Sequence, residues 1–313
     1  MRVLLTGAGG FVGPHVTRAL EAAGHAVVRL VGPKASAQEA TPVDLTDARA
    51  TLELVRTIRP EAVVHLAARA RPGGAEHLQT LLDNNARCAG NVLAACHSAM
   101  PRARIVLVSS SAVYGQVPKE RNPIGELEAL QPVLPYGVSK VAVEAIGSTY
   151  RALGLDIVTV RPFNLAGPGQ APGFIPASFA RQIVALESGP AGRVVEAGSL
   201  EAVRDLTDVR DAARAFALLL EGRPGPGPYN VCSGTPRRVG DVLMALLTLA
   251  GLDVEVRTGV DAMLEPSLDI PYQCGDARAV AAAVGWRPEI PWEQTLRDTL
   301  WDWRLRLARG AKV

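Results

Sequence analysis

A glycine-rich turn close to the start of the chain constrains its fold more than any other feature. The octapeptide TGAGGFVG occupies residues 6–13, directly after the apolar run 3–5. Gly7, Gly10 and Gly13 recur every third residue. In a strand–loop–helix unit, one such glycine permits the tight turn, one lets a pyrophosphate approach the backbone, and one allows close helix–strand packing. The new helix offers phosphate its free N–H groups and positive dipole end. The motif alone is also compatible with a plain turn, so the surrounding sequence must decide between a turn and a phosphate site.

The surrounding pattern supports a dinucleotide site. Short β-branched runs alternate with longer segments that carry apolar residues at helical spacing, which predicts a doubly wound parallel sheet of the α/β Rossmann class, with helices on both faces. The predicted strands are 2–5, 26–31, 62–66, 104–109 and 157–161, and the predicted helices are 13–23, 48–58, 83–98 and 138–153. The turn follows the first strand and opens the first helix, so we interpret it as a dinucleotide site.

The sequence pattern changes after Pro162. Stretches rich in glycine and proline mark loops, and the strand–helix alternation becomes irregular. Residues 228–232 look like one more buried strand that returns to the sheet. We therefore predict a NAD(P)-binding Rossmann domain from 1–163 plus about 204–235. A smaller, interwoven C-terminal α/β substrate domain is predicted from 164–203 plus 236–313.

Composition excludes several classes of partner. The net charge of the 313 residues is only +2, and no Lys/Arg run that could track phosphates occurs, so no nucleic-acid partner is expected. No apolar stretch approaches the roughly 20 residues that span a bilayer, so no membrane partner is expected either. A strand beginning at residue 2 leaves no space for a signal peptide. The four cysteines are scattered, without a CxxC pair or a metal-ligand spacing. Reduced thiols, a cytoplasmic location and no metal are expected.

The end of the second predicted strand indicates which dinucleotide binds. An acidic side chain there would hold the ribose 2′-hydroxyl of NAD, and none is present. Arg29 and Lys34 could meet a 2′-phosphate, which favours NADP and leaves NAD open; each could equally be a solvated surface cation. Asp44 is a candidate for contact with the adenine amino group, or for capping the next helix.

A tyrosine and a lysine form the candidate catalytic pair. Tyr136 and Lys140 lie four apart in YGVSK and would project from one helix face, about 6 Å apart. A nearby ammonium favours the phenolate and would lower the pKa of Tyr136 from its ordinary value of about 10. The serines at 109–111 close the preceding strand, at the sheet edge where such folds bind ligands. A serine hydroxyl there could hold a substrate oxygen against Tyr136.

These motifs together resemble the extended short-chain dehydrogenase/reductases that act on nucleotide sugars. The resemblance covers essentially the whole chain and rests on TGAGGFVG, VVHLAA, DNNARCAGN, SSSAVYG, YGVSK and RPFNLAGPGQ. The segments FIPASFARQI, AGSLEAVRDLTDVRDAARA and PYNVCSG look most like GDP-4-keto-6-deoxy-mannose reductases and, less closely, GDP-mannose 4,6-dehydratases.

The resemblance implies a role for each candidate residue. Tyr136 would be the acid/base, Lys140 would bind the nicotinamide ribose and tune Tyr136, and Ser110 would be the hydroxyl partner, with Ser111 as an alternative. The expected cofactor-binding residues are Gly7, Gly10, Phe11, Val12, Gly13, Arg29, Lys34, Asp44, Leu45, Leu66, Ala67, Ala68, Asn85, Ser109, Tyr136, Lys140 and Pro162. The expected substrate-binding residues are Ser111, Asn164, Arg181 and Arg204, of which Arg204 would grip the diphosphate with two charge-assisted contacts.

Two departures from the family pattern bear on the reaction. Dehydratases of this superfamily place a glutamate, and GDP-fucose synthases a cysteine, where this chain has Ala112. Alanine transfers no proton, so dehydratase activity is not expected. Related reductases often carry an acid there, whereas many nucleotide-sugar 4-epimerases carry alanine. Glu265 replaces an arginine that the family uses on phosphate, which leaves the identity of the nucleotide open.

The sequence thus predicts NADP(H)-dependent reduction of a 4-keto group on a nucleotide-activated 6-deoxysugar, with a GDP-linked sugar favoured. A nucleotide-sugar 4-epimerase with tightly bound NAD is the alternative, and a non-catalytic NADP-binding redox sensor is less favoured because it would need neither Tyr136 nor Lys140. A homodimer is expected through the helices 83–98 and 138–153. The reason is that their apolar residues are expected to exceed what one sheet face can bury: Val92 and Leu93 on the first helix, and Val141, Val143 and Ile146 on the second.

Overall fold

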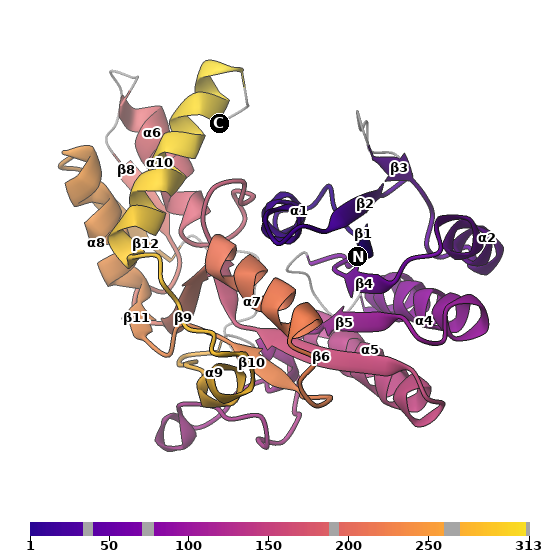
Figure 1. Cartoon of the computed structure of the whole chain (residues 1–313). Coiled ribbons are helices and arrows are strands. Elements are labelled where there is room, and N and C mark those ends of the chain that lie inside the picture. The colour runs from indigo at the N-terminus through magenta and orange to yellow at the C-terminus, as the bar shows by residue number, and fades with distance from the viewer. Residues whose placement is uncertain (34–39, 71–77, 188–193, 260–269, 311–313) are drawn as a thin grey trace.

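A parallel sheet organises the chain. In the computed structural model, which describes residues 1–33, 40–70, 78–187, 194–259 and 270–310, the sheet has seven strands in the order β10-β6-β5-β4-β1-β2-β3 (Figure 1). Every neighbouring pair in it is parallel. The strands are β1 (Arg2–Thr6), β2 (Ala26–Val31), β3 (Thr41–Pro42), β4 (Ala62–His65), β5 (Arg104–Val108), β6 (Asp156–Pro162) and β10 (Tyr229–Val231).

The strand order places a switch point between β1 and β4. From there the chain winds outward in both directions, which is the arrangement of a doubly wound Rossmann sheet, so the predicted fold class is confirmed. The five strands predicted in the first half of the chain are present, with ends that differ by at most one residue. The late strand expected within 228–232 is β10, and it pairs with β6. Ligands of such sheets bind at the carboxyl ends of the strands, beside the switch point.

Helices cover both faces of the sheet (Figure 1). On one face, α1 and α7 pack on β1 and β5; on the other, α2, α4 and α5 share a core with β4. Amphipathic spacing places the apolar side of each helix on the sheet. These helices are α1 (Gly13–Ala22), α2 (Ala48–Ile58), α4 (Arg87–Ala99), α5 (Pro135–Ala152) and α7 (Val209–Glu221). Short turns complete this part: α3 (Leu78–Leu81), the π-helix η2 (Leu82–Ala86), and the 3₁₀ helices η3 (Ser111–Val113) and η4 (Lys119–Arg121).

A second, smaller lobe has its own core. Helices α6, α8 and α10 enclose apolar side chains together with β8 and β9, and Figure 1 shows them to one side of the large sheet. Its sheets have the orders β11-β9-β7 and β12-β8. The elements are β7 (Asn164–Ala166), α6 (Ala177–Glu187), β8 (Val194–Ala197), β9 (Val203–Asp208), β11 (Pro236–Arg238), α8 (Val239–Ala250), β12 (Glu255–Thr258), α9 (Arg278–Val284) and α10 (Trp292–Ala308).

The proposed domain division agrees with most of this packing, and it stays a prediction. Helix α7 and strand β10 pack with the large sheet, although they come after the first stretch of the smaller lobe. Helix α9 and the buried Trp286 also contribute to the core of the large sheet, although both fall within the range predicted for the substrate domain. The two lobes are therefore interwoven through their chain connections.

The reason given for a dimer through α4 and α5 holds only in part. Val92, Leu93 and Val143 are each at most 1% exposed within a single chain, whereas Val141 and Ile146 are half-buried. The cover of the three buried residues comes from the sheet and from α2, because α2 and α4 pack side by side on the same face. The assembly itself stays a prediction. Within the described parts of the chain, the helices are too short or too polar for any of them to cross a membrane.

Candidate active site

The three glycines of the first turn occupy three different environments. Gly7 has a φ of 72°, in the left-handed region, and a Cβ on it would lie 2.8 Å from the backbone nitrogen of Ala67. A Cβ on Gly13 would lie 2.2 Å from the carbonyl oxygen of Ala8, so this glycine lets α1 pack against the turn. Gly10 is exposed. It is the glycine open to a ligand, and no side chain caps the N-terminus of α1 beside it.

Phosphate is the ligand that this turn fits. Uncapped N–H groups at a helix start attract anions, and here no acidic residue lies in the first turn of α1 to compete for them. Phe11 and Val12 are half-buried beside the turn. Because Gly10 is exposed beside these uncapped N–H groups, the residues present fit a dinucleotide pyrophosphate.

The ends of β1 and β4 meet beside this turn. The Thr6 hydroxyl lies 2.9 Å from His65 Nδ1 and accepts a hydrogen bond of 3.2 Å from the Ala67 backbone N–H. Leu66, Ala67 and Ala68 follow β4 as a half-buried segment at the carboxyl edge of the sheet. Sequence reasoning missed Thr6 and His65. Their positions, directly before the glycine turn and within VVHLAA, were the available signal.

The residues expected to select the cofactor are only partly described. Arg29 lies half-buried on β2, and Lys34 lies outside the described residues. Asp44 is exposed and accepts two hydrogen bonds from Thr46, at 2.9 and 2.6 Å. The N-cap of α2 is Asp47, so the alternative role of Asp44 as that helix cap is wrong. Leu45, the residue after Asp44, is buried. Ser109 and Pro162 are also buried, at the ends of β5 and β6.

Ser110 and Tyr136 are brought together by the packing of α5 on η3. Ser110 is the N-cap of η3, and its Oγ accepts a hydrogen bond of 3.2 Å from the Ala112 N–H. A hydrogen bond from Ser110 also lowers the pKa of Tyr136, against the larger effect of burial. A Cβ on Gly137 would lie 2.4 Å from the Ala112 carbonyl oxygen. Only glycine therefore permits α5 to approach η3 this closely, next to the tyrosine.

Lys140 lies one turn further along α5 and is buried. Its Nζ donates a 2.8 Å hydrogen bond to the Val108 carbonyl and lies 5.8 Å from the centre of the Tyr136 ring. Burial lowers the pKa of Lys140 to about 8, opposed by the carboxylate of Glu144.

The expected net lowering of the Tyr136 pKa is wrong for the chain by itself. The ammonium was expected to lower the pKa of the phenol, whereas burial raises it to about 12, and the Ser110 hydrogen bond offsets only part of the rise. The ammonium is engaged by a backbone carbonyl, so the low-polarity surroundings dominate. Tyr136 is therefore a protonated phenol at neutral pH, which is the form that donates a proton.

Asn85 joins two segments of the site through hydrogen bonds. It lies in the π-helix η2, a geometry frequent at functional sites, where the sequence predicted the start of a regular helix. Its amide bonds both backbone groups of Arg69, at 2.8 and 3.1 Å, and donates a 3.0 Å bond to the Ser139 hydroxyl. Asn85 thus connects the segment after β4 with α5.

Ser111 does not join the other candidates. It is 4% exposed, and its hydroxyl donates to the side chain of Gln273 at 3.3 Å, while Gln273 donates to the Ser111 carbonyl at 3.4 Å. In this structure the Ser111 side chain turns into the protein, and its contact with substrate stays a prediction. Of the two serines, Ser110 faces the tyrosine. Gln273 was missed because 162 residues separate it from Ser111.

The candidate substrate residues lie on the smaller lobe. Asn164 begins β7 and donates a 3.5 Å hydrogen bond to the Asp205 carbonyl on β9. Arg204, half-buried on β9, donates to the backbone carbonyls of Val203 and Ile270. Arg181 is half-buried on α6, and its Nε is without a hydrogen-bond partner in the described structure. Glu265 lies outside the described residues. Asn164 and Arg204 come near each other through the pairing of β7 with β9, whereas Arg181 lies on helix α6.

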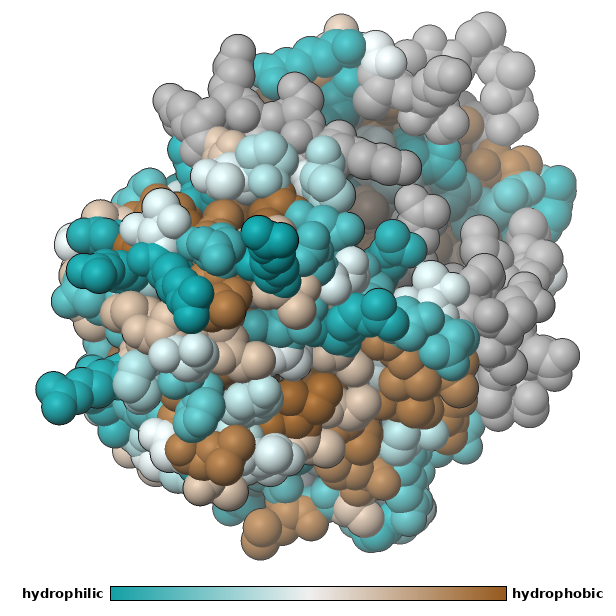
Figure 2. All heavy atoms as spheres, turned by 90° about the vertical axis from the view of Figure 1, so that its right-hand side faces the viewer, coloured by the Kyte–Doolittle hydropathy of each residue, from teal (hydrophilic) through white to brown (hydrophobic). Residues whose placement is uncertain are grey.

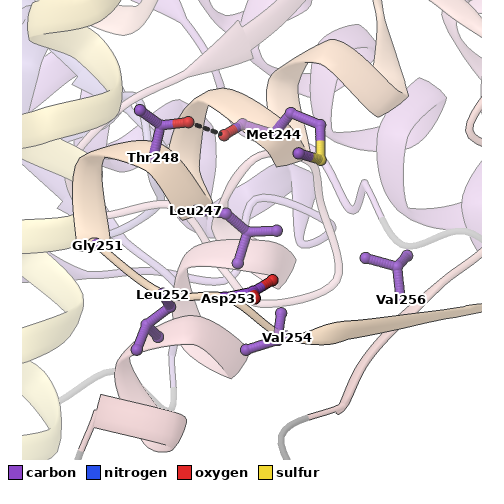
Figure 3. Close-up of a pocket in the computed structure, with 8 residues that line it drawn as sticks. All are labelled: Met244, Leu247, Thr248, Gly251, Leu252, Asp253, Val254 and Val256. Atoms are coloured by element: carbon purple, nitrogen blue, oxygen red, sulfur yellow. Dashed lines mark hydrogen bonds between the residues drawn. The ribbon is translucent and has the colours of Figure 1, made fainter.

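Two surface pockets are lined by residues other than the candidates above. One, of about 320 Å³, is lined mainly by apolar side chains of α8 and the chain leading into β12 (Figure 3). The other, of about 220 Å³, lies between β9 and the start of α10. Neither contains Ser110, Tyr136 or Lys140. Among the described residues, no group of three His, Cys, Asp or Glu side chains could hold a metal ion.

The fold and the Ser–Tyr–Lys arrangement at the sheet edge define a class of protein. The sequence model of the NAD dependent epimerase/dehydratase family matches residues 3–232, and the chain belongs to that family. Among known relatives, it is similar to the GDP-6-deoxy-D-mannose reductase of Pseudomonas aeruginosa, with 32% identity over 98% of each chain.

Solved structures agree with this assignment. The chain is similar to RMD from Pseudomonas aeruginosa complexed with NADPH, with a TM-score of 0.85 and 30% identity over 97% of this chain and 99% of the other. It is also similar to the NAD complex of UDP-glucose 4-epimerase from Thermus thermophilus, with a TM-score of 0.83 and 30% identity over the whole of both chains. Reductases and epimerases thus share this fold and pattern.

Proposed function

We propose that this protein reduces the 4-keto group of a nucleotide-activated 6-deoxysugar, with NADPH as the reductant and a GDP-linked sugar as the substrate. The observation that carries the proposal is the full-length similarity to a GDP-6-deoxy-D-mannose reductase. The paired hydroxyls of Ser110 and Tyr136 supply a site for the ketone oxygen. We also propose that the enzyme is a cytoplasmic homodimer.

Proton donation is the task of Tyr136. NADPH, when bound, supplies the hydride that adds to C4 of the sugar. Tyr136 gives its phenolic proton to the ketone oxygen, and Ser110 donates a hydrogen bond to that oxygen. With a pKa of about 12, Tyr136 carries its proton throughout the physiological range. The buried ammonium of Lys140 stabilises the phenolate left after proton transfer, through the charge that it holds one helical turn away.

Holding the two reactants in one cleft supplies much of the acceleration. Positioning can contribute about 7–11 kcal/mol to a reaction between two bound groups. The glycine turn and the N-terminus of α1 would hold the cofactor pyrophosphate, with Asp44 near the adenine. Asn164 would face the sugar or its phosphate, and Arg204 would reach the diphosphate with guanidinium N–H groups. Arg181, with an unpaired Nε, would add a further positive charge on the substrate side.

Preference for NADPH follows from the end of β2. Neither Val31 nor Gly32 can accept a hydrogen bond from a free ribose 2′-hydroxyl through its side chain. We expect higher kcat/KM with NADPH than with NADH. Gly32 is exposed, and a Cβ on it would touch nothing within 4 Å, so Gly32→Asp should fold normally. The new carboxylate should shift the ratio of kcat/KM toward NADH by accepting the 2′-hydroxyl and repelling a 2′-phosphate. A wild-type preference for NADH would overturn the cofactor assignment.

Nucleotide-sugar 4-epimerisation is the second candidate. Ala112 favours it, because many epimerases carry alanine at this position, and the similarity to a UDP-glucose 4-epimerase is also full-length. An epimerase would return the hydride to the opposite face of the same carbon and would keep NAD bound between turnovers. A non-catalytic redox sensor would need neither the Ser110–Tyr136 pair nor the buried Lys140, and the arrangement of these residues therefore disfavours it.

One experiment separates these functions. The purified protein is mixed with NADPH and a panel of GDP-, dTDP- and UDP-4-keto-6-deoxysugars, and NADPH consumption and product masses are followed. Stoichiometric NADPH oxidation with a mass gain of two hydrogens on a GDP-sugar is expected. Retained NAD in the purified protein, together with interconversion of 4-epimers and no net NADPH oxidation, would establish the epimerase instead.

A further inference from the structure

A buried group of hydrogen-bonded side chains lies behind the candidate catalytic residues. Its centre is Arg161 on β6, which forms two parallel hydrogen bonds with Glu144 on α5: Nε to Oε1 at 2.9 Å and Nη2 to Oε2 at 2.7 Å. The two side chains are only 6% and 11% exposed. A forked pair of this kind fixes direction as well as distance, because both nitrogens and both oxygens are engaged.

The same guanidinium reaches a third and a fourth element. Arg161 Nη1 donates to Tyr114 Oη at 2.9 Å, and Tyr114 Oη donates in turn to Asn230 Oδ1 at 2.7 Å on β10. Tyr114 is 1% exposed. Glu144, Arg161, Tyr114 and Asn230 form what we call the Arg161 network. It connects α5, β6, β10 and the segment that follows η3.

Two members of the network share their elements with the two catalytic hydroxyls. Glu144 follows Tyr136 by eight residues on α5, so both lie on the same face of that helix, two turns apart. Tyr114 is the C-cap of η3, and Ser110 is the N-cap of the same helix. The backbone N–H of Tyr114 bonds to the Ser111 carbonyl at 3.1 Å. A shift of Tyr114 therefore moves η3, and with it Ser110.

We propose that Arg161 is a positioning residue, which holds Ser110 at hydrogen-bond distance from Tyr136 by joining Tyr114 to Glu144. Close contact of Gly137 with Ala112 sets the approach of α5 to η3 at one point, and the Arg161 network sets it at a second. The Ser111–Gln273 hydrogen bonds also hold η3, so the network adds to two other contacts of this short helix. The inference rests on the proposed function only in that the reaction uses this Ser–Tyr pair, which an epimerase would use as well.

Tyr114→Phe tests the inference with the smallest change. It keeps the ring and removes only the hydroxyl that accepts the hydrogen bond from Arg161. We expect kcat to fall about tenfold, while KM for the nucleotide sugar and for NADPH stays within twofold, because the ligand-binding residues are untouched. Arg161→Lys keeps the charge but cannot make the forked pair, and it should lower kcat at least as far.

A matched control removes a comparable hydroxyl from the same pair of elements. Thr159 on β6 is 4% exposed, and its Oγ1 accepts a 3.0 Å hydrogen bond from Arg151 near the end of α5. Thr159 pairs with Leu107 on β5, and Arg151 lies at the opposite end of α5 from Tyr136. Thr159→Val should therefore lower the thermal midpoint about as much as Tyr114→Phe, yet leave kcat unchanged. This comparison separates positioning from general stabilisation.

Crystal structures of the wild type and Tyr114→Phe give a readout that needs no substrate. The distance from Ser110 Oγ to Tyr136 Oη should lengthen beyond hydrogen-bond range in the variant. A kcat within twofold of wild type, an equal loss in Thr159→Val, or an unchanged Ser110–Tyr136 distance would each overturn the inference. A wild type that turns over no nucleotide sugar would instead refute the proposed function, and the measured distance would still decide the role of the network.

Discussion

At the scale of single residues, the site depends on two ionisable side chains that burial moves in opposite directions. Burial raises the pKa of the Tyr136 phenol to about 12 and lowers the pKa of the Lys140 ammonium to about 8. Both shifts have one cause, since a low-polarity environment disfavours whichever form is charged. The result is a protonated acid next to a lysine that loses its charge close to physiological pH.

Replacement of Tyr136 by phenylalanine tests the acid directly. Tyr136→Phe should retain affinity for NADPH but lose kcat by roughly the 10²–10⁴-fold typical of a missing general acid. Cofactor titration by fluorescence and steady-state kinetics measure the two effects separately. Turnover that survives within a few-fold would show that another group supplies the proton.

The pH dependence of the reaction should report Lys140. Because its pKa is lowered to about 8, the ammonium is present below that pH and lost above it. We expect kcat/KM to fall above about pH 8, since a neutral amine no longer stabilises the Tyr136 phenolate. In Lys140→Met, activity should be low and this alkaline limb absent. A wild-type kcat/KM that stays constant up to pH 9.5 would contradict the assignment.

At the scale of elements, the sequence could predict the helices and strands that are determined by local sequence patterns. The strands β1, β2, β4, β5 and β6 were predictable because β-branched runs and glycine turns act within a few residues, and the carboxyl edge follows from parallel pairing. Contacts between distant segments were not predictable. Ser111 was assigned to the substrate because nothing near it in sequence shows that Gln273 covers it.

The same limit applies to the electrostatics of the site. The spacing of Tyr136 and Lys140 in sequence correctly indicates that they share a helix face. It does not show that the Lys140 ammonium bonds the Val108 carbonyl, or how deeply either group is buried. The four-residue spacing that continues from Tyr136 through Lys140 to Glu144 was an available signal for the Arg161 network. Its partner on β6 appears only in the folded chain.

Strand β4 ends in a histidine whose burial links stability to pH. Burial, with the positive charge of Lys140, lowers the pKa of His65 from 6.5 to about 3. The folded state therefore keeps His65 neutral, whereas the unfolded state takes up a proton below pH 6.5. Its contribution to stability is fully present above pH 6.5 and is lost as pH falls towards 3, by up to about 1.4 kcal/mol per pH unit.

Denaturant titrations from pH 4 to 7 can isolate this proton. His65→Gln keeps a polar side chain near Thr6. It should reduce the slope of the unfolding free energy against pH by up to the amount that the uptake of one proton contributes. Equal slopes in the wild type and His65→Gln would mean that His65 is protonated in the folded state as well.

At the scale of the whole molecule, the arrangement of α4 and α5 favours assembly, although Val92, Leu93 and Val143 are covered within one chain. The two helices pack side by side on one face of the sheet. Ile146 and Tyr150 on α5 remain half-buried, and Leu153 beyond its end is 56% exposed. Figure 2 looks at the side of the molecule that carries α2 and α4, and it shows apolar groups among hydrophilic ones, several of them in the lower half of the face.

A homodimer through α4 and α5 is the last prediction. Two such helices from each subunit, related by a two-fold axis, would form a self-complementary four-helix contact, as members of the resembled family often do. Light scattering at about 10 µM should give twice the 33.0 kDa chain mass. Ile146→Arg should yield monomers, because it places a charge where the two copies of α5 would meet. Met244→Arg, at a 57% exposed position on α8, should leave the dimer intact.

Assembly and catalysis should be coupled through α5. This helix carries Tyr136 and Lys140 at its start, so a second copy packed along it would limit its movement against η3. Monomers of Ile146→Arg should therefore show a lower kcat than wild type, while Met244→Arg should match it. A wild type that is monomeric at this concentration and fully active would show that α4 and α5 need no cover beyond their own chain, and that the Ser110–Tyr136 geometry is maintained within one subunit.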